Sequence, residues 1–142
     1  MIKVAIAGKF DPPHEGHLAN IKAAAKLGDF LIVITHFDNI VAENSAKRAC
    51  ILKYEVRRDL LMGLLALYGI KGDVIASVDI DGTVTETLKL IKPDILAKGG
   101  DRTPSNMPKS EIDVCKEIGC KIVYGVGGDK IASSSQLVRK AQ

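Results

Sequence analysis

Short apolar segments alternate with stretches of helical periodicity along the chain, and this alternation is the strongest constraint on the fold. The apolar segments predict five strands, at residues 2–7, 30–35, 73–78, 95–97 and 121–124. The periodic stretches predict helices at residues 15–27, 54–68, 83–91, 110–118 and 134–140. Strands that alternate with helices form a parallel sheet covered on both faces, and right-handed crossovers make it doubly wound. We therefore expect an α/β fold in a single domain over residues 1–142.

Composition narrows the possible classes of function. The net charge of +3 comes without a dense basic run, and aromatic residues make up 4% of the chain, so nucleic-acid binding is not indicated. Cys50, Cys115 and Cys120 are odd in number and irregularly spaced, which predicts reduced thiols rather than disulfides or a zinc site. No segment reaches the length of a membrane span and no secretory signal is visible, so we expect a cytoplasmic protein.

The turn at residues 8–17, Gly-Lys-Phe-Asp-Pro-Pro-His-Glu-Gly-His, carries the most specific pattern in the chain. His14 and His17 are one helical turn apart at the start of a predicted helix, so both rings can face the same point. Gly16 lets a ligand approach closely, and the positive end of the helix dipole favours phosphate. A histidine pair also suits a metal, but no third ligand is near in the sequence. The turn therefore predicts a phosphate site.

This turn matches the pattern G-x-F-D-P-x-H-x-G-H, on which the chain resembles the cytidylyltransferase-like HxGH nucleotidyltransferases. The resemblance implies that His14 and His17 bind a nucleoside triphosphate and stabilise the transition state. It also implies nucleotide contacts from four further residues of the turn, namely Gly8, Phe10, Asp11 and Gly16. In such enzymes the acceptor phosphate attacks the α-phosphorus in line, pyrophosphate leaves and Mg²⁺ assists.

The chain departs from the family pattern at two basic positions. Lys9 stands where most relatives have Thr or Ser, and we expect its ammonium to contact phosphate as a third catalytic group. Ala25 occupies a position late in the first helix where many relatives carry Lys or Arg. Lys22 or Lys26 could substitute for that residue, or either could be a solvated side chain.

Two further segments extend the resemblance. Residues 54–57, Tyr-Glu-Val-Arg, resemble a family stretch that implies a phosphate contact from Arg57, with a surface charge as the alternative. Residues 92–101 look like the adenylyltransferase domain of bacterial ADP-heptose synthesis, which implies that Lys98, Gly99 and Asp101 line the nucleotide site. A Rossmann-like strand order of 3-2-1-4-5 brings both strong motifs to the switch point between strands one and four, so we expect that order.

Near the end of the chain, Ser133, Ser134 and Ser135 fit the end of the family's closing motif and precede the last predicted helix. Their hydroxyls suit a phosphate, whereas capping of the helix would explain one of them. The arginine of that motif is missing, and Lys130 is the nearest basic residue.

Residues 79–83, Asp-Ile-Asp-Gly-Thr, match a phosphatase motif in which Asp79 would attack phosphate and Asp81 would act as acid and base. The motif lies too late in the chain for the phosphatase core to follow. Thr83 and Glu86 also fit a capping box for the next helix, which is the interpretation we favour.

Together these patterns predict a nucleotidyltransferase that transfers AMP from ATP to a small phosphorylated acceptor such as a sugar 1-phosphate. CTP with a polyol phosphate, and ATP with flavin mononucleotide (FMN), stay open as alternatives. A nucleotide-binding module without turnover is a rival hypothesis, supported by the atypical Lys9, Ala25 and Ile131. We expect no accompanying kinase domain, so the acceptor would be phosphorylated elsewhere, and the family's precedent implies a homodimer.

Overall fold

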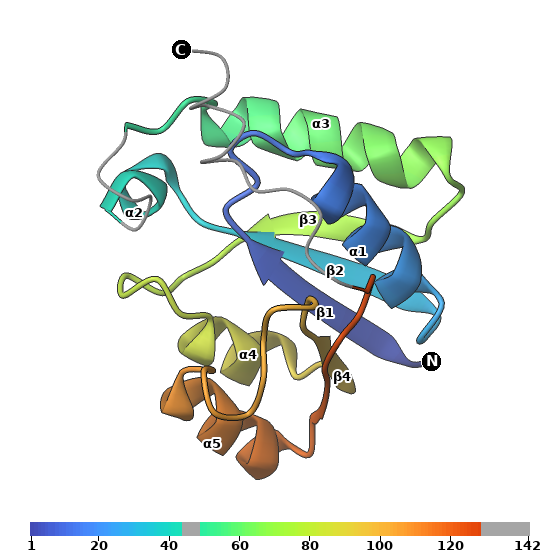
Figure 1. Cartoon of the computed structure of the whole chain (residues 1–142), viewed down its shortest axis with the longest axis vertical. Coiled ribbons are helices and arrows are strands. Elements are labelled where there is room, and N and C mark those ends of the chain that lie inside the picture. Colours follow the sequence, from blue (N-terminus) through green and yellow to red (C-terminus); the bar gives the residue numbers. More distant parts are fainter. Residues whose placement is uncertain (44–48, 129–142) are drawn as a thin grey trace.

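The computed structural model describes residues 1–43 and 49–128, and in it five parallel strands form one sheet (Figure 1). The strands are β1 (Lys3–Gly8), β2 (Phe30–Thr35), β3 (Gly72–Ala76), β4 (Ile95–Ala97) and β5 (Lys121–Val123). Their order is β3-β2-β1-β4-β5, which confirms the predicted Rossmann-like topology. The direction of strand addition reverses between β1 and β4, so the switch point lies at the carboxyl end of β1.

The helices agree closely with the periodicity of the sequence. They are α1 (Glu15–Ala25), α2 (Asp38–Glu43), α3 (Tyr54–Leu67), α4 (Thr85–Ile91) and α5 (Lys109–Ile118). Helix α2 was not among the predicted helices, and the helix predicted at 134–140 lies outside the described residues. Within the described ranges, each helix is too short or too polar to cross a membrane.

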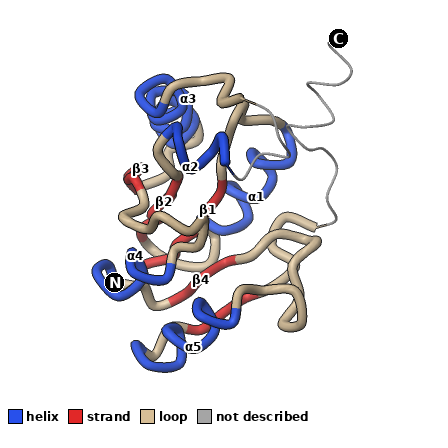
Figure 2. Tube along the Cα trace, turned by 90° about the vertical axis from the view of Figure 1, so that its left-hand side faces the viewer, coloured by secondary structure: helices blue, strands red, loops and turns tan. Residues whose placement is uncertain are grey.

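Different helices cover the two faces of the sheet (Figures 1 and 2). One core cluster joins α1 and α3 to the strands and includes Val4, Ile6, Ile21, Ala24, Leu31, Val33, Leu61, Leu65 and Val74. The other joins α4 and α5 to the opposite face and includes Ala5, Ile32, Ile34, Leu88, Leu96, Val114, Cys115 and Cys120. Successive residues of one strand alternate between the clusters, which explains why the strands read as continuous apolar runs.

The start of α4 differs from the prediction. The helix begins at Thr85, and its N-cap Val84 makes no side-chain capping bond, so the capping box predicted from Thr83 and Glu86 does not form. Instead the Asp79 carboxylate accepts hydrogen bonds from the main-chain N–H groups of Glu86 (2.8 Å) and Thr87 (3.1 Å). It also accepts one from the Thr87 hydroxyl at 2.8 Å. Because Asp79 is 7% exposed and engaged in this way, it anchors a helix start and is not presented as a phosphatase nucleophile.

Replacement of Asp79 by asparagine tests this anchoring role. An amide offers one acceptor oxygen where the carboxylate offers two, so one of the α4 amides loses its partner. We expect Asp79→Asn to lower the free energy of unfolding by about 1–2 kcal/mol, measured by urea denaturation. Asp81→Asn is the matched control, because Asp81 is exposed and accepts hydrogen bonds from Thr83 within the same loop, and its effect is expected to stay below about 0.5 kcal/mol. Equal midpoints for all three proteins would contradict the assignment.

Candidate active site

The turn after β1 folds back around the side chain of Phe10. Phe10 is 3% exposed and adopts a positive φ of 51°. A Cβ atom placed on Gly8 would lie 3.1 Å from the Phe10 ring, so a larger residue there would crowd the ring against the strand end. The same ring meets that of His17 edge-on, with ring centroids 4.6 Å apart. Gly8 and Phe10 thus form the support on which His17 rests.

The two histidines form a stacked pair at the N-terminus of α1. Their ring centroids are 3.7 Å apart and the ring planes differ by 20°. His14 is the N-cap residue, and its Nδ1 accepts a hydrogen bond from the Gly16 main-chain N–H at 3.1 Å. The Nδ1 of His17 accepts one from the His14 main-chain N–H at 3.2 Å.

These bonds fix how each ring presents itself. Because both Nδ1 atoms accept from main-chain amides, the hydrogen-bond network assigns the proton of each neutral ring to Nε2. Each histidine then carries an Nε2–H donor beside the positive end of the α1 dipole. The arrangement suits an anion with several oxygens, as the sequence predicted for His14 and His17.

Asp11 connects the turn to the segment that precedes α3. Its carboxylate is fully buried and accepts from the main-chain N–H groups of Ile51 (2.8 Å) and Leu52 (2.6 Å). Charge-assisted bonds of this kind are stronger than neutral ones. The carboxylate is therefore directed at the protein's own main chain, and it shapes the site by holding two segments together. The predicted nucleotide contact of Asp11 stays a prediction.

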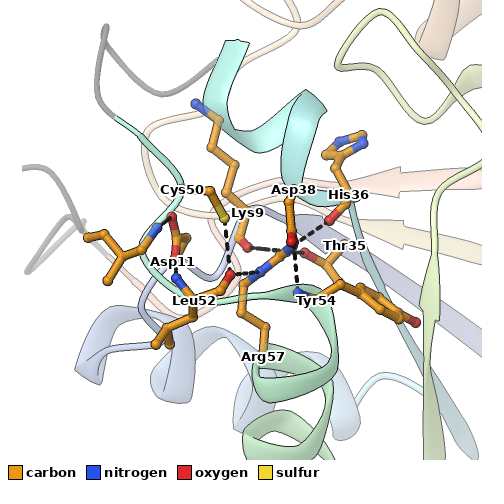
Figure 3. A network of polar contacts seen from close by, with 10 residues as sticks. Lys9, Asp11, Thr35, His36, Asp38, Cys50, Leu52, Tyr54 and Arg57 are labelled. Atoms are coloured by element: carbon orange, nitrogen blue, oxygen red, sulfur yellow. Dashed lines mark hydrogen bonds and ion pairs between the residues drawn. The ribbon is translucent and has the colours of Figure 1, made fainter.

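The Arg57 network, defined as the Arg57 guanidinium with its five acceptors, lies behind the turn (Figure 3). Arg57 is fully buried on α3. Its Nε donates to the Leu52 carbonyl at 3.0 Å. Its Nη1 donates to the Lys9 carbonyl (3.1 Å) and the Thr35 hydroxyl (2.7 Å). Its Nη2 donates to the His36 carbonyl (2.8 Å) and the Asp38 carboxylate (2.9 Å).

This network corrects the prediction for Arg57. A guanidinium has five N–H donors, and here all five are directed at protein oxygens. In this arrangement Arg57 has no N–H group left to donate to a phosphate. Because its side chain is fully buried, it is not a surface charge either. Arg57 instead joins the β1 turn, the end of β2, α2 and the segment before α3. The sequence pattern did not indicate that the guanidinium would face the protein's own oxygens.

On the other side of β1, the loops after β4 and β5 pack against α1. The Asn20 side-chain amide donates to the Val126 carbonyl at 3.0 Å. A Cβ atom on Gly127 would lie 3.0 Å from the Asn20 main chain, and one on Gly99 would lie 3.4 Å from the Asn20 amide nitrogen. Asn20 therefore joins α1, the helix that follows β1, to the loops after β4 and β5. Sequence reasoning missed Asn20 because a polar helix residue resembles any solvated one.

Lys98 follows β4 and is held by a buried partner. Its ammonium lies 3.0 Å from the Glu111 carboxylate, with the two side chains 12% and 5% exposed. The other oxygen of Glu111 accepts from the Val84 main-chain N–H at 3.1 Å. If Lys98 lines the nucleotide site as the sequence predicts, Glu111 already orients the ammonium that would contact the nucleotide. Asp101 lies in the exposed loop beyond it, where its carbonyl accepts from the Asn106 side chain.

The other residues predicted for the site lie either far from the histidine turn or outside the described residues. Lys22 and Lys26 line a groove of about 470 Å³ together with Tyr68 and Lys71. That groove lies at the end of α1 opposite the histidines, so neither lysine is near the turn. The Lys22 ammonium stacks on the Tyr68 ring, 4.7 Å from its centroid. Ser133, Ser134, Ser135 and Lys130 lie outside the described residues.

His36 lies beside the Arg57 network, and no sequence pattern singled it out. It follows β2, is 6% exposed and lies among charged groups that include Asp79, Glu111, Arg57 and Lys9. Burial lowers the pKa of the imidazole, and the attraction of Asp79 and Glu111 opposes this effect without overcoming it. The ring is therefore neutral at pH 7.

Two adjacent arginines on α3 allow a matched test of the Arg57 network. A lysine at position 57 supplies one ammonium in place of a five-donor fork, so several buried oxygens lose their partner. We expect Arg57→Lys to lower the free energy of unfolding by about 3 kcal/mol in urea denaturation. Arg58→Lys changes a partly exposed side chain 3.4 Å from Asp73, and its effect is expected to stay below about 0.5 kcal/mol. Similar losses in the two variants would show that the network does not hold the site together.

Comparison with known proteins agrees with this geometry. The cytidylyltransferase-like family matches residues 5–141. The chain is 33% identical over 135 residues to the bifunctional protein HldE of Gluconobacter oxydans, covering 95% of this chain but 26% of HldE. It is 30% identical over 142 residues to the FAD synthase of Thermococcus sibiricus, covering 98% and 91% of the two chains.

A solved structure shows the same fold in a related sequence. The lipopolysaccharide core biosynthesis protein from Thermoplasma volcanium superposes with a TM-score of 0.69 at 28% identity, over 87% of this chain and 95% of that one. The family match covers nearly all of the chain, including the histidine turn, the switch-point loops and the helices that support them. The chain therefore belongs to the cytidylyltransferase-like family and is a nucleotidyltransferase.

Proposed function

We propose that this nucleotidyltransferase transfers AMP from ATP to the phosphate of a small acceptor, with a sugar 1-phosphate as the first candidate, and releases pyrophosphate. The observation that carries the proposal is the stacked pair His14 and His17, whose Nδ1 atoms are both occupied by main-chain N–H groups. Two Nε2–H donors at a helix N-terminus can stabilise the negative charge of a triphosphate, including the charge that develops on the leaving group.

The reaction would need little chemistry from the protein beyond placement and charge stabilisation. An oxygen of the acceptor phosphate attacks the α-phosphorus of ATP, forming one P–O bond. The bond between the α-phosphorus and the oxygen that bridges to the β-phosphate breaks, and pyrophosphate leaves with that oxygen and its electrons. His14 and His17 would donate hydrogen bonds to the phosphoryl oxygens, and the Lys9 ammonium would offset charge on the same groups.

We propose that Mg²⁺ enters with the triphosphate. The described residues contain no group of three His, Cys, Asp or Glu side chains that could hold a metal ion. An ion coordinated mainly by phosphate oxygens and water does not require such a group, so the site is compatible with it. When bound, Mg²⁺ would neutralise part of the charge on the leaving pyrophosphate.

The relatives favour ATP as the nucleotide and suggest two acceptors. HldE relatives support a sugar 1-phosphate, although the chain spans about a quarter of their length. The FAD synthase of Thermococcus sibiricus matches over nearly its whole length and supports FMN as the second candidate. Lys98, Gly99 and Asp101, together with Ser133 to Ser135, are proposed to line the nucleotide side, where the loops after β4 and β5 meet α1 at Asn20.

Pyrophosphate release tests the nucleotide, the acceptor and the catalytic pair together. ATP, CTP and GTP are each supplied with Mg²⁺ and with heptose 1-phosphate, FMN or glycerol 3-phosphate. We expect release with ATP and heptose 1-phosphate, and a decrease in kcat of about 100-fold or more in His17→Ala because a transition-state donor is lost. Glu15→Gln changes the exposed residue between the histidines and is expected to keep wild-type kcat.

Each other outcome overturns a defined part of the proposal. Preference for CTP would make the choice of AMP wrong, and preference for FMN would replace the sugar phosphate as acceptor. Unchanged release in His17→Ala would remove the histidine pair from catalysis. Binding of ATP without release for any acceptor would favour the nucleotide-binding module.

A further inference from the structure

His36 lies next to the catalytic turn and is rigidly held. The sheet register pairs Gly8 of β1 with Thr35 of β2, so His36 is the first residue beyond the strand on the side away from β4. Its carbonyl accepts from Nη2 of Arg57 at 2.8 Å. Figure 3 shows the imidazole outside the Arg57 network, pointing away from the guanidinium while the carbonyl points toward it.

The ring carries a buried nitrogen that lacks a partner. His36 is 6% exposed, and its Nδ1 makes no hydrogen bond within the part of the chain that the structure describes. A buried polar atom in this condition costs about 1–3 kcal/mol, and such atoms are rare in native proteins. An unsatisfied buried atom of this kind calls for an explanation, and a ligand atom that bonds to it is one.

The surrounding charges favour a particular kind of ligand atom. Asp79 is already bonded to the start of α4, and Glu111 is already paired with Lys98. The Arg57 guanidinium and the Lys9 ammonium also act on the ring, which burial keeps neutral. A neutral imidazole has one donor and one acceptor nitrogen, so it can bond a phosphate oxygen or a hydroxyl group without adding charge.

The position of His36 distinguishes the two substrates. Asn20 gathers the loops after β4 and β5 on one side of β1, which is the side proposed for the nucleotide. His36 lies on the other side of β1, at the end of β2. An in-line attack needs the acceptor and the leaving pyrophosphate on opposite sides of the α-phosphorus.

We propose that His36 is a specificity-determining residue that hydrogen-bonds an oxygen of the phosphorylated acceptor. This proposal rests on the proposed function and deepens it by assigning the acceptor side of the site. Asp79 and Glu111 then act indirectly, through the effect of their charges on the imidazole.

Substitution by phenylalanine separates recognition from folding. His36→Phe keeps a planar ring but removes both nitrogens, so it also removes the unsatisfied buried atom. We expect the KM for the acceptor to rise about tenfold or more, which is the loss of one good hydrogen bond, while the KM for ATP changes less than about twofold. The melting temperature without ligand is expected to stay the same or rise. His36→Gln, which restores an amide donor and acceptor, is expected to recover part of the acceptor affinity.

A neighbouring residue provides the matched control. Phe37 is 50% exposed and packs on the Tyr54 ring, with centroids 5.1 Å apart. Phe37→Leu is expected to leave both KM values unchanged. An equal rise of both KM values in His36→Phe, or a fall of its melting temperature without ligand, would overturn the proposal in favour of a structural role.

A binding measurement separates this proposal from the proposed function. Heptose 1-phosphate and FMN are titrated calorimetrically into protein that is saturated with Mg²⁺ and α,β-methylene-ATP, which cannot react. Acceptor binding to the wild type that weakens about tenfold in His36→Phe supports both proposals. Equal acceptor binding to the two proteins overturns the role of His36 and leaves the proposed function standing. Binding of neither acceptor to the wild type overturns both.

Discussion

The fully buried guanidinium of Arg57 is the interaction on which the geometry of the site depends. Its five N–H groups join the β1 turn, the end of β2, α2 and the segment before α3. The Asp11 carboxylate makes a second connection between that turn and that segment through two main-chain amides. A buried charge is stable only when fully bonded, so these segments must take up their positions together. The turn that carries the histidine pair is therefore held in place by buried polar groups as well as by the apolar core.

The histidine turn could be predicted because its motif is local in the sequence. The strand order could be predicted because two such motifs have to meet at one place in the sheet. Apolar runs such as residues 30–35 identify buried strands, and two motifs that must share one cleft select the order 3-2-1-4-5. The roles of Arg57 and Asp79 could not be predicted in the same way. Their partners lie elsewhere in the chain, and a short motif says nothing about whether a charged side chain faces a ligand or the protein.

His36 and Asn20 illustrate a further limit of sequence reasoning. Neither belongs to a spacing pattern, and a polar residue after a strand or within a helix has many ordinary explanations. Their importance follows from the packing around them: the loops after β4 and β5 converge on Asn20, and Nδ1 of His36 lacks a partner among the described residues. The central strand β1 then separates a proposed nucleotide side from a proposed acceptor side.

The proposed reaction joins the two substrates through an oxygen of the acceptor phosphate, which forms the new bond to the α-phosphorus of ATP. An acceptor whose phosphate oxygens are labelled with ¹⁸O tests it, with the product examined by ³¹P NMR. The phosphorus derived from ATP is expected to acquire one ¹⁸O in the bridge to the acceptor, seen as an isotope shift of its signal. A product whose ATP-derived phosphorus carries no ¹⁸O, or the release of labelled inorganic phosphate in place of a joined product, would contradict it.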